Sequence, residues 1–329
     1  MIMAFTQHPQ IMLLLASILL SIFYMLLHKS PENTIILYFW IRLLSYIGFV
    51  FIYFFKETII SFNPEALEQF IFDTSYYNIP LYILSAICSV GTYIIFDFLM
   101  KSYTIPLILA LSQISILIVS IGYFILGDHI TLLSSIGIII IFIGAFTSCF
   151  KIISFKNHFF FFEQIDKNLL FWTFIKSLLY SFTALITYVC VSPFNQKTKM
   201  ILHLLTKYLH PFQCLPIIPI YFNISVQLAM CLFFLLFIHF YQKKAATIIP
   251  ILFQYVSLIL TLSLLHIIYA LLLYESYNFI SNKNIITAIG QLYLPFTFLG
   301  GIFFYNEKKS LNEWLGIGLI VFGNIISLF

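Results

Sequence analysis

The sequence contains few charged residues: they make up 9% of the chain, whereas hydrophobic residues make up 62% and the mean hydropathy is +1.04. A water-soluble globule of 329 residues must present a polar surface, and this composition does not provide one. Of the 16 basic residues only Arg42 is an arginine, and the small net charge of +4 does not point to nucleic acid as a partner. We therefore expect an integral membrane protein.

The chain also lacks the motifs of metal binding and catalysis. Five cysteines lie in or near apolar segments without CxxC spacing, which favours free thiols over disulfides or a metal site. His203 and His210 are seven residues apart with no third ligand candidate nearby, so they are best interpreted as solvated side chains. HExxH, GxSxG, GxGxxG and phosphate-binding P-loop motifs are missing. We expect no enzyme, no cofactor and no metal.

Long apolar stretches dominate what is present. A membrane-spanning helix needs about 20 mostly apolar residues. Ten stretches approach that length: 10–28, 34–55, 79–100, 104–126, 132–151, 168–190, 220–241, 250–275, 284–305 and 312–329. The first lacks the basic start and small-residue cleavage site of a signal peptide, so we expect it to remain as a helix. The prediction is an all-α membrane protein with ten transmembrane helices.

An internal repeat organises these stretches. Residues 128–150 align without a gap to residues 307–329, at an offset of 179. The alignment pairs an acid with an acid and, in three places, a glycine with a glycine: Asp128 with Glu307, Gly137 with Gly316, Gly144 with Gly323, and Gly122 with Gly301. The repeat unit is then five helices, over 1–151 and 168–329, joined by a loop at 152–167. An odd number inverts the second copy in the membrane, an arrangement common in transporters.

Two polar stretches interrupt the pattern. Asn63-Pro64-Glu65, within 57–78, has the residues of a helix start. In 197–210, inside an extended connection at 190–220, lysines and apolar residues alternate at helical spacing, which suits a helix lying in the membrane interface. A solvated connection is the alternative for both.

The lysines of the loops bear on the orientation in the membrane. The loops on the side of the termini contain 5 lysines and those on the other side contain 9, so the positive-inside rule favours external termini.

Three motifs resemble the drug/metabolite transporter superfamily, in its ten-helix EamA-like branch. They are Phe39-Trp40-Ile41-Arg42-Leu43-Leu44, Gly127-Asp128-His129-Ile130-Thr131-Leu132, and Glu307 followed by Trp314-Leu315-Gly316 and Gly323. The chain departs from that family in having Asp128 for glutamate and His129 for a basic residue. The resemblance implies cytoplasmic termini, against the lysine count. It also implies two inverted five-helix repeats and transport of a small metabolite.

Charged residues inside the apolar stretches are the first candidates for a site, because burying a charge in a bilayer is costly unless it is paired or wet. Arg42 lies near the middle of its stretch and must find an acceptor. Asp97, one turn beyond Tyr93, is a candidate acceptor, or a group that titrates and couples transport to protons. A structural buried pair is the alternative. We expect Arg42, Tyr93 and Asp97 to face a central cavity. For Lys176 and Glu275 we favour a structural role, with both able to reach the interface.

Uncharged polar residues form a second candidate group. Asn223 and Gln227 lie four apart, Gln113 and Gln291 occupy nearly equivalent repeat positions, and His266 shares a helix face with Tyr269. Such groups either join helices or line a cavity. With 21 Tyr and 39 Phe, an aromatic cavity suited to a cationic or ring-bearing ligand is expected. The repeat glycines are expected to pack helices closely, and the two aligned acids to cap helix ends.

These observations predict a multi-pass secondary transporter of the bacterial inner membrane that works by alternating access. The resemblance implies that the substrate is an amino acid, a nucleoside-like compound such as S-adenosylmethionine, or a cationic drug. The expected partners are this substrate, the lipid bilayer and a coupling proton or exchanged metabolite, with no nucleic acid, in a monomer or homodimer. A membrane enzyme acting on lipid and a non-transporting scaffold are the alternatives.

Overall fold

The structure is a computed structural model that describes most of the apolar part of the chain. The described residues are 9–27, 34–60, 79–103, 105–126, 131–149, 167–191, 219–279, 286, 289–290, 292–306, 308 and 310–327. The predicted helix start at 63–65, the predicted interfacial helix at 197–210, Asp128, Gln291, Glu307 and the side chain of Glu275 lie outside them.

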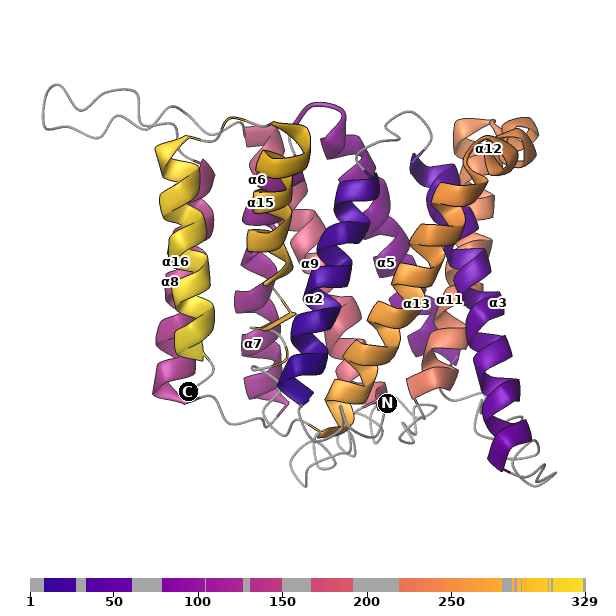
Figure 1. Ribbon diagram of the computed structural model, residues 1–329, viewed down its shortest axis with the longest axis horizontal. Coiled ribbons are helices and arrows are strands. Elements are labelled where there is room, and N and C mark those ends of the chain that lie inside the picture. The colour runs from indigo at the N-terminus through magenta and orange to yellow at the C-terminus, as the bar shows by residue number, and fades with distance from the viewer. Residues whose placement is uncertain are drawn as a thin grey trace, which may run out of the picture.

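Helices make up nearly all of the described residues, and no strand occurs among them. The helices are α2 (Pro9–Leu27), α3 (Thr34–Ile60), α5 (Ile79–Met100), α6 (Ile105–Leu111), α7 (Ile114–Ile125), α8 (Leu132–Cys149), α9 (Lys167–Val191), α11 (Pro219–Phe237), the π-helical turn η1 (Ile238–Gln242), the 3₁₀ turn η2 (Ala245–Thr247), α12 (Ile248–Gln254), α13 (Val256–Phe279), α15 (Tyr293–Tyr305) and α16 (Leu311–Ser327). The long helices stand side by side in one bundle (Figure 1). The all-α prediction is confirmed for the part of the chain that the structure describes.

Seven spans among the described residues are long and apolar enough to cross a membrane. They lie in α2, α3, α5, α6 with α7, α9, α11 with η1, and α13, while α8, α15 and α16 supply shorter apolar segments. Large apolar side chains such as Phe124, Phe303 and Leu132 are 63%, 74% and 78% exposed, which suits a lipid-facing surface. The chain is a multi-pass membrane protein.

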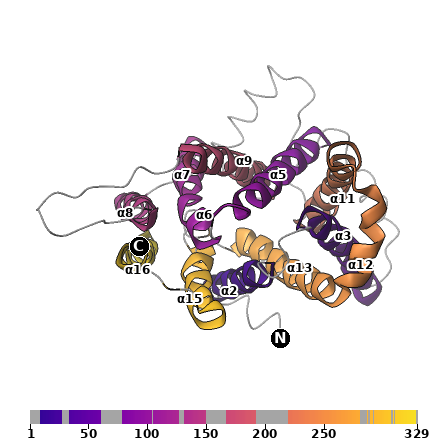
Figure 2. The ribbon, with the colours of Figure 1, turned by 90° about the horizontal axis from the view of Figure 1, so that it is seen from above.

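Besides 284–305, where α15 begins only after a turn at Leu292, two of the predicted stretches are interrupted within the described residues. In 104–126 the helix breaks between α6 and α7 at Ser112 and Gln113. The Ser112 hydroxyl donates to Ile108 O at 2.6 Å and the Ser115 hydroxyl to Ser112 O at 2.7 Å, so side chains compete for backbone carbonyls at the break. In 250–275 the break falls at Tyr255, and the short α12 crosses the end of the bundle (Figure 2). Hydrophobicity alone did not reveal either break.

α8 and α16 form a closely packed antiparallel pair at one edge of the bundle (Figures 1 and 2). A Cβ atom placed on Gly144 would lie 2.7 Å from Gly316 O, and one on Gly323 would lie 2.6 Å from Gly137 O. Contacts between 144 and 316 and between 137 and 323 require helices that run in opposite directions. The four glycines therefore pack helices, as predicted, and no side chain fits between the two backbones.

Local structure repeats at the 179-residue offset. Gln113 and Leu292 precede α7 and α15 with nearly equal backbone angles, φ −62° and ψ −15° against φ −63° and ψ −11°. Before α8, the Thr131 hydroxyl accepts from Ser134 N at 3.1 Å, and before α16 the Ser310 hydroxyl accepts from Glu313 N at 3.3 Å. The N-caps of both helices are thus these hydroxyl residues.

Candidate functional site

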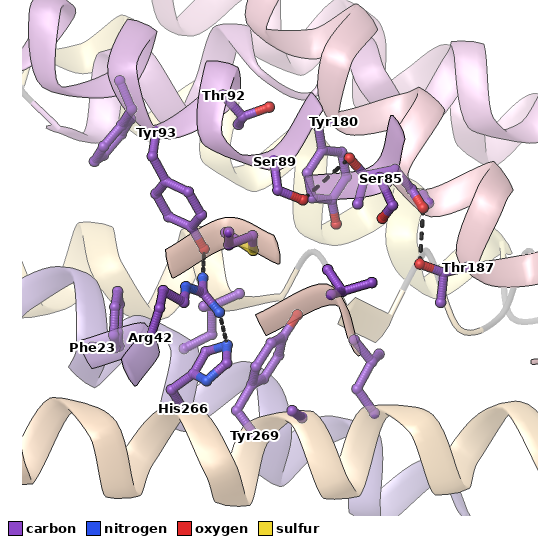
Figure 3. A pocket seen from close by; sticks show the side chains of 18 of the residues that line it. Phe23, Arg42, Ser85, Ser89, Thr92, Tyr93, Tyr180, Thr187, His266 and Tyr269 are labelled. Atoms are coloured by element: carbon purple, nitrogen blue, oxygen red, sulfur yellow. Dashed lines mark hydrogen bonds between the residues drawn. The ribbon is translucent and has the colours of Figure 1, made fainter. Parts of the chain in front are cut away.

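A cavity of about 190 Å³ lies in the middle of the bundle. Its walls come from α2, α3, α5, α9, α11 and α13, with Ser112, Ser115 and Tyr293 added from the α6–α7 break and α15. Figure 3 shows side chains from several of these helices converging on the same space. Because the surrounding helices span the membrane, the cavity lies at membrane depth.

Arg42 projects from α3 into this cavity and is 4% exposed. Its guanidinium donates to the Tyr93 hydroxyl and the His266 ring, and to Gln227 Oε1 at 3.3 Å (Figure 3 shows the first two). The guanidinium carbon also lies 4.8 Å from the centroid of the Tyr93 ring, in cation–π contact. The structure thus brings four predicted site residues, Arg42, Tyr93, Gln227 and His266, into one cluster from four helices.

The hydrogen bonds define the tautomer of His266. Arginine is only a donor, so His266 Nε2 must accept from it. The proton then sits on Nδ1, which lies 3.1 Å from Ser45 Oγ and donates to it. Ser45 is fully buried on α3 one turn beyond Arg42, so one helix holds both groups that orient the imidazole.

Lys176 is a second basic side chain of the cavity, and the expectation that it reaches the membrane interface was wrong. It is 6% exposed and lines the cavity. Its Nζ donates to Ser112 Oγ at 2.7 Å and lies 5.3 Å from the centroid of the Phe96 ring. Position along a helix does not reveal which neighbours a side chain faces, and α9 turns Lys176 inward.

Asp97 does not lie where it was expected. Its carboxylate forms an ion pair with Lys101 at 3.1 Å, one turn further along α5, and it is not among the residues that line the cavity. The acceptors described for Arg42 are neutral side chains instead. The prediction that Asp97 faces the cavity was therefore wrong, because Asp97 follows Phe96 directly and turns to another face of α5.

The remaining candidates divide between the cavity and its surroundings. Asn223 lines the cavity with Gln227, four residues away on α11. Gln113 is buried at the helix break, where its Nε2 donates to Leu109 O at 3.2 Å and its side chain interacts with that of Tyr293, a lining residue. Gln113 therefore supports the cavity wall, whereas Gln291 lies outside the described residues.

Hydroxyl groups cover the wall between α5 and α9, a feature that the sequence-based reasoning missed. Besides Tyr93, the lining hydroxyl residues of these two helices are Ser85, Ser89, Thr92, Ser177, Tyr180, Thr183 and Thr187. Ser89 Oγ and Thr183 Oγ1 approach to 3.4 Å across the two helices. The four-residue spacing of Ser85 with Ser89 and of Thr183 with Thr187 could have shown that hydroxyls share one face on each helix.

Aromatic rings close part of the cavity. Tyr38 and Phe234, both fully buried, stack at a centroid distance of 6.2 Å, and Tyr38 contacts the Tyr93 ring at 4.3 Å. Tyr24 packs against Phe96 at 5.5 Å. The expectation of an aromatic cavity agrees with these contacts, but the rings of Tyr93 and Phe96 already carry cations of the protein itself.

Among the described residues, no group of three or more His, Cys, Asp or Glu side chains is placed to hold a metal ion. What the lining of the cavity offers a ligand is hydrogen-bonding groups, basic side chains and aromatic surface.

No protein-family model matches this chain, and no curated protein matches its sequence.

Proposed function

We propose that this protein is a secondary transporter of a small polar metabolite in the bacterial inner membrane. It would work by alternating access between two inverted five-helix halves, as the resemblance to EamA-like drug/metabolite transporters implies. The observation that carries the proposal is a cavity at membrane depth that contains buried basic and hydroxyl side chains. Three helices of each half line it: α2, α3 and α5 from the first, and α9, α11 and α13 from the second.

The pattern of helix packing supports the inverted repeat. In chain order, α2 corresponds to α9, α3 to α11, α5 to α13, α7 to α15 and α8 to α16. Under that exchange the pairing of α2 with α13 becomes that of α9 with α5, and α2 with α15 becomes α9 with α7. Likewise, α3 with α13 becomes α11 with α5, and all six pairs are in contact. The remaining major pairs, α3 with α11 and α8 with α16, exchange into themselves, as a two-fold axis requires.

The two ends of the cavity differ, which supports alternating access. Tyr38, one turn into α3, stacks on Phe234, one turn before the end of α11, and both rings pack against Tyr93, which lines the cavity. Towards the other side of the membrane the lining continues to Thr187 near the end of α9 and Asn223 near the start of α11. In this proposal Tyr38 and Phe234 form a gate between the halves, and they separate when the opposite side closes.

No ATP-binding motif occurs in the chain, so a gradient or an exchanged metabolite would drive the cycle. The test has two steps. First, purified protein is screened for thermal stabilisation by a metabolite panel, because a ligand stabilises the fold to which it binds. Each hit is then tested for counterflow in proteoliposomes, with Arg42→Ala as the inactive control. We expect saturable exchange. Binding without exchange would contradict transport, no binding at all would favour a scaffold, and chemical conversion of lipid would favour an enzyme.

A further inference from the structure

We propose that the ligand of this cavity carries a carboxylate or phosphate group, which binds between Arg42 and Lys176. This inference rests on the proposed function and names the chemical class of the substrate. It narrows the sequence-based expectation, which included cationic compounds, to soluble anions and zwitterions bound through their anionic end.

The two cations face the same stretch of the cavity wall. Arg42 lies over the ring of Tyr93 and Lys176 over the ring of Phe96, at 4.8 and 5.3 Å from the centroids. Tyr93 and Phe96 are three residues apart on α5, so they share a helix face with a rise of about 4.5 Å between them. Arg42 comes from α3 and Lys176 from α9, and each packs against a ring of α5 that lines the cavity.

The described lining of the cavity contains no aspartate or glutamate. The nearest carboxylate along α5, Asp97, is paired with Lys101 outside the lining. Coulomb energies in a low-dielectric interior are several times larger than in water. An anion placed between the two basic groups would be attracted by both of them.

The available donors suit an anion as well. The guanidinium offers a planar set of N–H groups, and the ammonium offers a compact charge, the two cations that proteins use for carboxylate and phosphate. Ser112, whose Oγ accepts from Lys176 Nζ at 2.7 Å, lines the cavity beside it. A cationic ligand would find no carboxylate in the described lining, and two of the aromatic faces that could attract it are already occupied. The volume of about 190 Å³ limits the ligand to a small metabolite.

The test compares molecules of similar size that differ in charge. 4-Hydroxybenzoate and glycerol phosphate are the anionic probes, 4-hydroxybenzamide and glycerol their uncharged partners, and 4-hydroxybenzylamine the cation. Binding is measured as the thermal shift and by calorimetry on the full chain in nanodiscs of phosphatidylcholine. We expect saturable binding of at least one anionic probe, and at least tenfold weaker binding of its uncharged partner and of the cation. This corresponds to the loss of about one charge-assisted hydrogen bond.

Variants of the cavity then locate the binding site. Lys176→Gln is expected to weaken binding of the anionic probe about tenfold or more, and Lys176→Arg to restore most of the affinity. Lys167→Gln, which removes an exposed cation from the same helix, should leave the affinity unchanged. Arg42→Gln should act like Lys176→Gln. If it fails to fold, the three lysine variants still decide the question.

Four outcomes would overturn the inference. The first two are selective binding of the uncharged or cationic probe and the absence of binding by every probe. The third is binding of the anionic probe with the same affinity in Lys176→Gln as in wild type. The fourth is Lys176-dependent stabilisation by phosphatidylglycerol in place of the soluble probes. The last would assign the site to a lipid headgroup. If a neutral or cationic metabolite is exchanged in proteoliposomes, only this inference fails. If no metabolite is exchanged at all, the proposed function fails as well.

Discussion

Gly144 and Gly316 lie directly against each other where α8 crosses α16. A Cβ atom on Gly144 would lie 2.7 Å from Gly316 O, and one on Gly316 would lie 2.6 Å from Gly144 O. In the repeat these are not equivalent residues: Gly144 is equivalent to Gly323, and Gly316 to Gly137. The contact of Gly144 with Gly316 is therefore the repeat equivalent of the contact of Gly323 with Gly137. A single packing motif, used twice, forms both halves of the helix pair.

This contact predicts the sign of two glycine substitutions. Gly144→Ala should destabilise the protein by about 1–3 kcal/mol, because the new methyl group must displace backbone atoms of α16. Gly318→Ala, on the exposed face of α16, meets no atom within 4 Å and should be neutral or stabilise the helix by up to about 1 kcal/mol. Thermal unfolding in detergent measures both. Equal stability of the two variants would contradict the packing.

Arg42→Ala should abolish transport while the folded protein remains abundant in the membrane. Arg42→Lys should also lose most activity, by about tenfold or more, because one ammonium cannot reach Tyr93, Gln227 and His266 in a planar arrangement. Counterflow in proteoliposomes, normalised to monodisperse protein, is the measurement. Normal transport by Arg42→Ala would show that the cluster has no role in transport.

Asp97→Asn should leave the pH profile of transport unchanged. The carboxylate is paired with Lys101, whose side chain is 61% exposed, and it does not line the cavity. The loss of that pair should cost at most about 1 kcal/mol of stability. Uptake by wild type and variant is compared between acidic and alkaline pH. A shifted profile would restore Asp97 as a proton-coupling residue.

Ser45→Ala should weaken ligand binding several-fold without unfolding the protein. The change removes the acceptor of His266 Nδ1–H and frees the imidazole to adopt the tautomer that cannot accept from Arg42. Ser263→Ala is the matched control on α13, because that hydroxyl donates to Ile259 O of its own helix at 2.7 Å. Calorimetry with a ligand found in the screen separates the two variants, and equal effects would show that the tautomer is irrelevant.

Both ends of the described chain should lie on one side of the membrane, opposite the lysines at 243 and 244. Pro9 begins α2 and Ser327 ends α16 at the same end of the bundle, whereas the turn between α11 and α12 lies at the other end (Figure 1). Reporter fusions at Met1 and Phe329 should therefore agree with each other, and cysteine labelling at Lys244 should give the opposite side. Disagreement between the two fusions would contradict this topology. The side on which they agree decides between the lysine count and the family resemblance.

Several features could be predicted from the sequence because they depend on local patterns. Continuous apolar stretches with few charges are stable in lipid only as helices that satisfy their own backbone, and helices occupy every one of the ten stretches. The glycine repeat predicted close helix packing, because its seven-residue spacing places two glycines on one face. A lone arginine in the middle of an apolar stretch needs protein partners, so Arg42 stood out without any structure.

Only the tertiary structure decided which polar groups meet. Lys176 and Asp97 are both ionisable residues within apolar helices. Lys176 lines the cavity, whereas Asp97 pairs with Lys101 and does not line it. The difference comes from how each helix is rotated against its neighbours, and that rotation results from packing over the whole bundle. Composition and repeats thus determined a membrane bundle built on one motif used twice. The charge of its cavity emerged only when helices from distant parts of the chain turned Arg42 and Lys176 toward the same wall.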